Sequence, residues 1–313
     1  MIFKGSAPSN IALIKYMGKE SGGGNRAVNP SLSMTLGAFR TDVELEEISG
    51  AEDRWRPLPG SAPLREESTR RFVEFFQKLK KENGIQGAFE IRSGNNFPSD
   101  AGLASSASSF AALTKTALTA FASLKNSLPP DAAAMARVSR TGSGSSCRSF
   151  FAPWCRWEGE HVGAVESALP ELIDLVAVLD SGFKKVSSSD AHRRVQSSPL
   201  FQGRVERATQ RMVALEDAMK RGNYRKVAEL SWEELWEMHS LFHTSQPPFF
   251  YYAPETLSVL RWAEDCWEKK GHGPIATIDA GPNVHLLVPA KEAAEFRAEL
   301  ELIPGIRVME SPA

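Results

Sequence analysis

The stretch PSDAGLASSAS (98–108) decides the fold of this chain, because it joins a strand pattern to a long helix pattern through small residues. Residues 87–93 (GAFEIRS) have the composition of a strand, and the Ala-rich segment 103–124 has the periodicity of a helix. Gly102 permits a tight turn ahead of that helix. A helix N-terminus carries about half a positive charge, so the loop predicts a phosphate-binding site.

The serines of this loop support the same interpretation. The hydroxyls of Ser105, Ser106 and Ser108 can bind phosphate oxygens or a magnesium ion. The sequence does not contain the Walker pattern GxxxxGK[ST], so this is not an ordinary P-loop. From composition alone an alternative stays open, in which the small residues only cap the helix and let it pack closely.

Strand and helix patterns follow one another along the chain without strict alternation. This mixture predicts an α+β fold rather than a doubly wound sheet. We expect two lobes, residues 1–165 and 166–313. Strands are predicted at 31–48 (one long strand or a hairpin), 172–180, 275–279, 284–288 and 306–310; helices are predicted at 68–83 with Ser68 as N-cap, about 200–222, 224–243, 254–270 and 290–301.

The composition indicates an ordinary globular protein of the cytoplasm. The chain has 313 residues with 37 basic and 38 acidic side chains, a balance that argues against a nucleic-acid partner. The three cysteines cannot all pair and form no CxxC, which favours a reducing compartment. No stretch approaches the ~20 apolar residues of a membrane span, so we expect no membrane partner. The sequence leaves a homodimer open.

Two further segments carry polar groups suited to anions and proton transfer. In residues 142–146 (GSGSS), hydroxyls and N–H groups gather just before Arg148, which can hold an anion with two hydrogen bonds. The alternative there is a serine-capped helix start with a solvated arginine. Asp279 enters the Ala-Gly-Pro turn after an apolar strand, where it is either a turn residue or a base. Lys15 follows an apolar run and would ordinarily snorkel to the surface.

Four segments together resemble one family. Residues 98–108 are similar to the phosphate motif PxxxGLxSSA of the GHMP kinase superfamily. Residues 7–19 (APSNIALIKYMGK) resemble APxNIAxIKYWGK, residues 141–149 (TGSGSSCRS) resemble RxGSGSACRS, and residues 277–284 (TIDAGPNV) resemble FTxDAGPNA. In this order and spacing the motifs are characteristic of mevalonate diphosphate decarboxylase, and the likeness extends over essentially the whole chain.

The resemblance implies a two-lobe GHMP-kinase-like fold with the active site in the cleft between the lobes. It implies ATP and Mg²⁺ as cofactors and a phosphorylated mevalonate as the small-molecule substrate. The residues that it places at the nucleotide are Pro98, Ala101, Gly102, Leu103, Ala104, Ser105, Ser106 and Ser108, with Ser106 as the magnesium ligand.

The resemblance also assigns roles at the substrate. Asp279 matches the catalytic carboxylate, Lys15 faces it, and Arg148 holds the substrate carboxylate. The residues expected to contact the rest of the substrate are Tyr16, Lys19, Ser143, Ser145, Ser188 and Ser189.

The chain departs from the family pattern in two places. Met17 stands where the family usually has Trp. Residues 186–192 (VSSSDAH) align with VSSxxGM, so that Ala191 and His192 replace Gly and Met, and Asp190 brings a negative charge close to the expected phosphates.

The function implied is ATP-dependent decarboxylation of mevalonate 5-diphosphate to isopentenyl diphosphate through phosphorylation of the 3-hydroxyl. Two related alternatives are a phosphomevalonate decarboxylase and a mevalonate 3-kinase that stops after phosphorylation. An alternative of another class is a non-catalytic protein that binds ATP or an isoprenoid precursor. The catalytic residues Asp279, Lys15 and Arg148 argue against that last reading.

Overall fold

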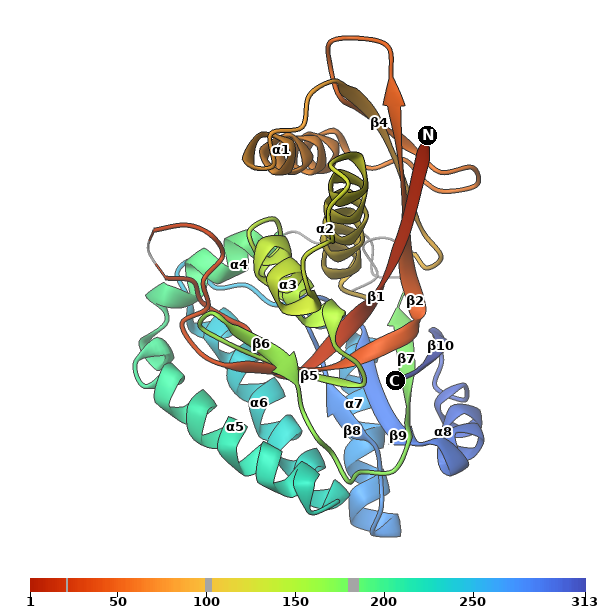
Figure 1. Cartoon of the computed structure of the whole chain (residues 1–313). Coiled ribbons are helices and arrows are strands. Elements are labelled where there is room, and N and C mark those ends of the chain that lie inside the picture. Colours follow the sequence, from red (N-terminus) through yellow and green to blue (C-terminus); the bar gives the residue numbers. More distant parts are fainter. Residues whose placement is uncertain (21, 99–102, 180–185) are drawn as a thin grey trace.

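The structure is a computed structural model that describes residues 1–20, 22–98, 103–179 and 186–313. Its described strands form a six-stranded sheet and a four-stranded sheet, with helices packed around both (Figure 1). The α+β fold expected from the sequence is confirmed. The strands are β1 (Ile2–Ile14), β2 (Ser31–Ile48), β3 (Arg54–Pro57), β4 (Ala88–Asn95), β5 (Trp154–Glu158), β6 (His161–Ala164), β7 (Leu172–Leu179), β8 (Ile275–Thr277), β9 (Val284–Pro289) and β10 (Ile306–Pro312). The α-helices are α1 (Glu66–Glu82), α2 (Ser105–Leu124), α3 (Ala132–Arg140), α4 (Ser188–Arg194), α5 (Arg204–Lys220), α6 (Tyr224–Thr244), α7 (Pro254–Asp265) and α8 (Ala293–Leu300).

The first sheet is organised by β2, a single strand of 18 residues rather than a hairpin. β1 runs antiparallel to it along nearly its whole length, from the centre of the molecule to one end (Figure 1). Different parts of β2 pair with β4 and with β5 on its other edge. The helices α1 and α2 cover this sheet, and Phe72, Phe76 and Phe121 on their apolar faces are buried as the periodicity predicts.

The start of α1 differs from the prediction. Ser68 is not the N-cap, because the helix begins at Glu66 with Arg65 as N-cap and without a side-chain cap. Glu66 and Glu67 occupy the first turn, where acidic side chains stabilise the positive end of the helix dipole. The helix therefore begins two residues before the predicted range, and Ser68 lies within its first turn.

The second sheet has the strand order β10-β7-β9-β8 and packs against α5 and α6. One hydrophobic cluster contains Ile11 and Leu32 from the first sheet together with Val176, Met212 and Leu287 from the second half of the chain. Because this cluster is continuous, the loops at the ends of both sheets are held on one rigid core.

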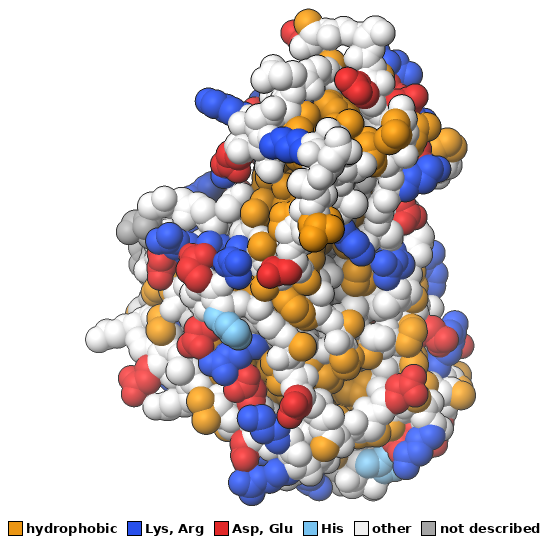
Figure 2. All heavy atoms as spheres, in the orientation of Figure 1, with side chains coloured by type: hydrophobic (Ala, Val, Ile, Leu, Met, Phe, Trp, Pro, Cys, Tyr) orange, Lys and Arg blue, Asp and Glu red, His pale blue; other side chains and the backbone are white. Residues whose placement is uncertain are grey.

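Charges of both signs are interspersed over the face of the molecule shown in Figure 2, with hydrophobic side chains between them. Among the described helices, none combines the length and the apolar character needed to cross a membrane.

A buried ion pair joins the two halves beneath the cavity. Glu234 on α6 and Arg204 on α5 are both completely buried, and Arg204 Nη1 donates to Glu234 Oε2 at 2.9 Å. The backbone N–H of Lys15, just after β1, donates to Glu234 Oε1 at 2.9 Å. Glu234 therefore connects the end of β1 to the helices of the second half.

We predict that Arg204→Met lowers the free energy of unfolding by about 3 kcal/mol, because it removes the completely buried partner of Glu234 and leaves Arg211, which is 12% exposed, as the remaining cation paired with that carboxylate. Urea unfolding followed by circular dichroism measures the change. The matched control is Arg207→Met, since Arg207 is 42% exposed and pairs with Glu237. That control should cost about 1 kcal/mol or less. Equal losses in the two variants would contradict a structural role for the buried pair.

Candidate active site

A cavity of about 390 Å³ lies where β1, the N-terminus of α2, the start of α4 and the turn after β8 meet. Its size is that of a small-molecule site, and its walls are rich in polar groups. The sequence-predicted residues that line it are Lys15, Tyr16, Lys19, Ala104, Ser105, Ser106, Ser143, Ser145, Arg148, Ser188, Ser189 and Asp279. Residues from all four motifs are thus brought together in space.

The wall of the cavity includes an ion pair between Lys15 and Asp279. Lys15 Nζ lies 2.6 Å from Asp279 Oδ1, with the lysine side chain 2% exposed and the aspartate 30% exposed. Burial alone would raise the pKa of Asp279, but the adjacent Lys15 ammonium holds that pKa below its usual range. Burial also lowers the pKa of Lys15, against the opposing effect of Asp279. The lysine does not snorkel, and the aspartate is ionised and partly open to the cavity.

Backbone hydrogen bonds fix the two partners. Asn29 Nδ2 donates to the Lys15 carbonyl at 2.9 Å, while Glu234 accepts from the Lys15 N–H. Asp279 is carried by the turn that follows β8, and Thr277 Oγ1 at the end of this strand donates to the Ala12 carbonyl in β1 at 2.9 Å. The two charged groups therefore meet because β8 is tied to β1.

The Gly-Ser segment needs its glycines for packing. A Cβ on Gly142 would lie 2.2 Å from the Phe110 ring, and one on Gly144 would lie 2.4 Å from the Tyr16 ring. The chain from Gly144 to Phe150 forms a 3₁₀ helix with Ser143 as N-cap. Because the Tyr16 ring packs on Gly144, the loop that carries Ser143 and Ser145 is held against the end of β1.

Arg148 is buried rather than solvated, with 4% of its surface exposed. Its Nη1 donates to Ser31 Oγ at 2.8 Å, and its guanidinium lies 6.0 Å from the centre of the Trp157 ring. Its Nε has no hydrogen-bond partner among the described residues. A buried cation that still has a free donor and lines a cavity is suited to an anionic ligand.

The phosphate-loop residues fall into three groups. The first group lines the cavity and consists of Ala104, Ser105 and Ser106. Ala104 adopts a left-handed conformation (φ 48°), and Ser105 is the first residue of α2. Ser143 Oγ donates to Ser106 Oγ at 3.3 Å, which links this loop to the Gly-Ser segment.

The remaining residues of that loop lie elsewhere. Pro98, Leu103 and Ser108 do not line the cavity. Leu103 is in the hydrophobic core, and Ser108 is buried, where its hydroxyl lies 2.7 Å from Thr41 Oγ1. These positions give Leu103 and Ser108 a packing role. Ala101 and Gly102 lie outside the described residues.

Cations gather at the side of the cavity near Lys19. Lys19 Nζ donates to Asn25 Oδ1 at 2.8 Å, and Tyr16 Oη donates to the Asn25 carbonyl at 3.1 Å. Burial, together with Arg71 and Arg193, lowers the pKa of Lys19. Cations that repel one another in this way favour binding of an anion between them.

The departures at 186–192 have a simple structural explanation. Asp190 does not line the cavity, because its carboxylate accepts from Ser187 Oγ at 2.7 Å and pairs with Arg193. The negative charge of Asp190 is therefore engaged by Ser187, the N-cap of α4, and by Arg193. His192 does line the cavity, and its Nδ1 accepts the N–H of Gly18 at 3.1 Å. Gly18 directly follows Met17, so this hydrogen bond connects the two places where the chain departs from the family pattern.

Sequence reasoning missed several residues of the cavity wall, among them Asn25 and Arg71, and it missed the buried Glu234 that accepts from the Lys15 N–H. Asn25, with φ 54°, directly follows the glycine run 22–24, and it lines the cavity. Arg71 on α1 also lines it and donates to the Gly142 carbonyl at 3.4 Å. An asparagine beside a glycine run was an available signal for the first. Arg71 and the buried Glu234 look like ordinary helix-surface charges in the sequence.

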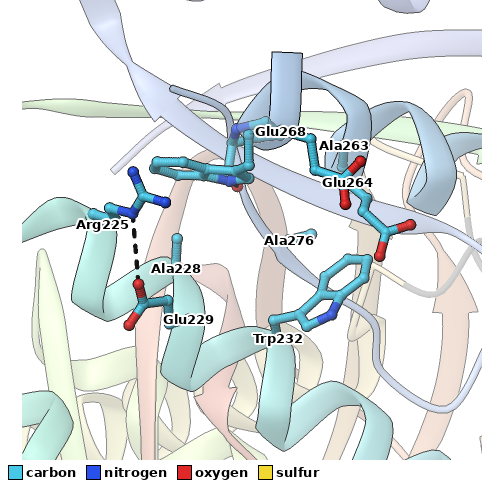
Figure 3. Close-up of a pocket in the computed structure, with 10 residues that line it drawn as sticks. Arg225, Ala228, Glu229, Trp232, Ala263, Glu264, Glu268 and Ala276 are labelled. Carbon is cyan, nitrogen blue, oxygen red and sulfur yellow. Dashed lines mark hydrogen bonds and ion pairs between the residues drawn. The ribbon is translucent and has the colours of Figure 1, made fainter. Parts of the chain in front are cut away.

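A second, smaller cavity of about 180 Å³ lies between α6, α7 and β8 (Figure 3). Its walls include Trp232 and Trp267, with Glu229, Glu264 and Arg225 among the charged residues. Arg225 lies 5.5 Å from the centre of the Trp267 ring and pairs with Glu229. The cation–π position on this ring is therefore occupied by a side chain of the protein itself.

Comparison with known proteins identifies the family. A family model described as "Diphosphomevalonate decarboxylase-like N-terminal domain" matches residues 7–168, and one described as "Mevalonate 5-diphosphate decarboxylase C-terminal domain" matches residues 174–306. The chain is 33% identical to the diphosphomevalonate decarboxylase of Gibberella zeae, over 92% of this chain and 81% of that protein. The chain belongs to the diphosphomevalonate decarboxylase family.

Solved structures agree with this assignment. A mevalonate diphosphate decarboxylase from Legionella pneumophila superimposes with a TM-score of 0.92 at 41% identity, over 99% of this chain and 100% of that one. A structure of MDDEF in complex with MVAPP, AMPPCP and magnesium has a TM-score of 0.88 at 28% identity, over 100% and 98%. The family resemblance and the GHMP-kinase-like fold inferred from the motifs are confirmed.

We predict that Lys15→Met raises the pKa of Asp279, since burial then acts on the carboxylate without its counter-charge. In the wild type the lowered pKa of Asp279 contributes stability above its unfolded-state value, near 3.8, and that contribution is lost as the pH falls through the folded pKa. In the variant the folded-state pKa of Asp279 lies above its unfolded-state value, so protonation stabilises the folded protein. The stability deficit of the variant relative to wild type should therefore shrink as the pH falls from 7 to 5. Urea unfolding at several pH values measures this.

The control for that experiment is Lys78→Met, because Lys78 is 50% exposed on α1. Its effect should be small and independent of pH. A Lys15→Met deficit that stays constant or grows between pH 7 and 5 would contradict the ion pair.

Proposed function

We propose that this protein catalyses the ATP-dependent decarboxylation of mevalonate 5-diphosphate to isopentenyl diphosphate, through phosphorylation of the 3-hydroxyl. The observation that carries the proposal is the Lys15–Asp279 pair at 2.6 Å, set in a cavity that also contains Arg148 and the Gly-Ser segments. The named activity of the relatives supports the same reaction.

Asp279 is the proposed base. It accepts the proton of the 3-hydroxyl as that oxygen attacks the γ-phosphorus of ATP and ADP leaves. Lys15 keeps Asp279 ionised and lies where it can stabilise negative charge on the transferred phosphoryl group. When the 3-phosphate departs, its C–O bond electrons leave with it. The carboxylate is then lost as CO₂, and the electron pair of the broken C–C bond forms the double bond.

The nucleotide is proposed to bind at the start of α2. Ala104, Ser105 and Ser106 line the cavity there, and the helix has no side-chain cap, so its first-turn N–H groups are suited to phosphate. The Ser106 hydroxyl, within 3.3 Å of Ser143 Oγ, fits the proposed magnesium ligand because oxygen donors suit this ion. ATP supplies the phosphoryl group and Mg²⁺ neutralises phosphate charge. Pro98, Ala101, Gly102, Leu103 and Ser108 are proposed as further residues of this nucleotide-binding segment.

The substrate is proposed to lie with its two anionic ends apart. Arg148 holds the carboxylate near Lys15 and Asp279, since its buried guanidinium lines the cavity and its Nε has no hydrogen-bond partner among the described residues. The phosphate tail lies toward Lys19. The side chains proposed to hold that tail and the chain leading to it are Tyr16, Lys19, Ser143, Ser145, Ser188 and Ser189.

The decisive experiment incubates the protein with MgATP and, separately, mevalonate, its 5-phosphate and its 5-diphosphate, while ADP and CO₂ are both measured. Release of both products with the diphosphate supports the proposal. Release of both with the monophosphate alone identifies a phosphomevalonate decarboxylase. ADP without CO₂ identifies a kinase, and neither product identifies a binding protein.

We predict that Asp279→Asn lowers turnover by about 10²–10⁴-fold, because it removes the negative charge and the proton acceptor. Nucleotide affinity should change little, since the nucleotide is proposed to bind at α2. Steady-state turnover, nucleotide binding and thermal midpoint are measured on one preparation. Asp217→Asn is the control, as Asp217 is 57% exposed and pairs with Arg221. Turnover within a few-fold of wild type at position 279 would exclude a base, and a variant that only unfolds would assign Asp279 to the turn.

Three broader expectations remain predictions. The division into lobes at 1–165 and 166–313 is supported by the change of sheet between β6 and β7. The cytoplasm is proposed as the compartment, in line with three cysteines that are all buried and free. A homodimer is tested by light scattering of the purified protein.

A further inference from the structure

His192 occupies a position where the family pattern has methionine, and its surroundings are those of a hydrogen-bond donor. The ring is 8% exposed and lines the main cavity. It packs against the Tyr16 ring with centroids 4.3 Å apart. A methionine at this position could fill the same space but could not donate a hydrogen bond.

One hydrogen bond fixes which ring nitrogen carries the proton. The Gly18 N–H donates to His192 Nδ1 at 3.1 Å, so Nδ1 must be unprotonated. Burial and the neighbouring Lys19 ammonium lower the pKa of His192 to about 3, which keeps the ring neutral near pH 7. A neutral ring that accepts at Nδ1 carries its proton at Nε2.

The Nε2–H group is available to a ligand. None of the residues that the structure describes is hydrogen-bonded to it, although the ring is more than nine-tenths buried. Because Nε2 is not shut off from solvent and the residue lines the cavity, a ligand there can reach this donor and accept a hydrogen bond from it.

The charges around this donor indicate the chemistry of the ligand. Lys19, Ser188 and Ser189 line the same cavity, and the pKa of Lys19 is lowered in part by Arg71 and Arg193. These cations already repel one another in the free protein. A neutral N–H group adds a hydrogen bond to an anion without adding to that repulsion.

We propose that His192 is a substrate-binding residue whose Nε2–H donates a hydrogen bond to the phosphate tail of the substrate. This inference rests on the proposed function, since it takes the substrate to be a phosphorylated mevalonate. It assigns a role to the departure at 186–192, where the chain replaces an apolar side chain with a polar one. His192 takes no part in the proton transfer assigned to Asp279.

Two conservative variants separate this role from a purely structural one. In His192→Gln the amide NH₂ can stand near Nε2, so the donor to the ligand is kept while the acceptor for Gly18 is lost. In His192→Asn the amide oxygen can stand near Nδ1, so the bond from Gly18 is kept while the donor to the ligand is lost. Thus His192→Gln retains the donor at the Nε2 position, and His192→Asn retains the acceptor at the Nδ1 position.

Calorimetric titration with mevalonate 5-diphosphate gives the dissociation constant of each variant without relying on turnover. We expect His192→Gln to stay within about threefold of wild type and His192→Asn to bind about 10-fold more weakly, as for loss of a hydrogen bond to a charged group. Thermal midpoints and ATP affinity serve as controls for folding and for the nucleotide site.

The inference is overturned if His192→Asn binds the diphosphate as tightly as His192→Gln or more tightly, whatever the absolute affinities. That result would assign the histidine to holding Gly18. If the wild-type protein itself fails to bind mevalonate 5-diphosphate, the proposed function falls instead, so the two failures are distinguishable.

Discussion

The Glu234 carboxylate accepts hydrogen bonds from the backbone of Lys15 and from Arg204, at a depth where none of these groups meets solvent. Taking a carboxylate out of water is costly, and only partners held in the correct places offset that cost. The end of β1, helix α5 and helix α6 must therefore assemble together. Because Lys15 is the residue that carries the ammonium to Asp279, the constraint that joins the halves of the chain also sets the geometry of the cavity.

The cavity is built by contacts between loops that are far apart in the sequence. Ser106 meets Ser143, Gly144 receives the Tyr16 ring, and Thr277 bonds to Ala12. Each contact joins one family motif to another. The residues proposed for the nucleotide and for the substrate are consequently neighbours, joined by a shared hydrogen bond or a close packing contact. The resulting preorganisation suits a reaction whose catalysis depends on positioning and on charge.

Much of the fold could be predicted from the sequence because the signals are local. The periodicity of α1 and the alternation in the second half of β2 depend on burial of one face, which neighbouring residues reveal. The start of α1 was misplaced because two glutamates can stabilise a helix end without a serine cap. Asn25, Arg71 and Glu234 escaped notice for a different reason. Their importance arises from tertiary neighbours more than 20 residues away or from a turn conformation, neither of which composition records.

The hydrophobic cluster shared by the two sheets limits how the protein can change by recombination. Ile11 and Leu32 pack in the same cluster as Val176, Met212 and Leu287. A hybrid that took its second half from a relative at 33% identity would keep this packing only where the side chains of the relative fill the same volumes. Side chains of other volumes would leave gaps or clashes in an interior packed to crystal-like density. Substitutions in this cluster on one half of the chain are therefore expected to be accompanied by compensating substitutions on the other half, even though separate family models match the two halves.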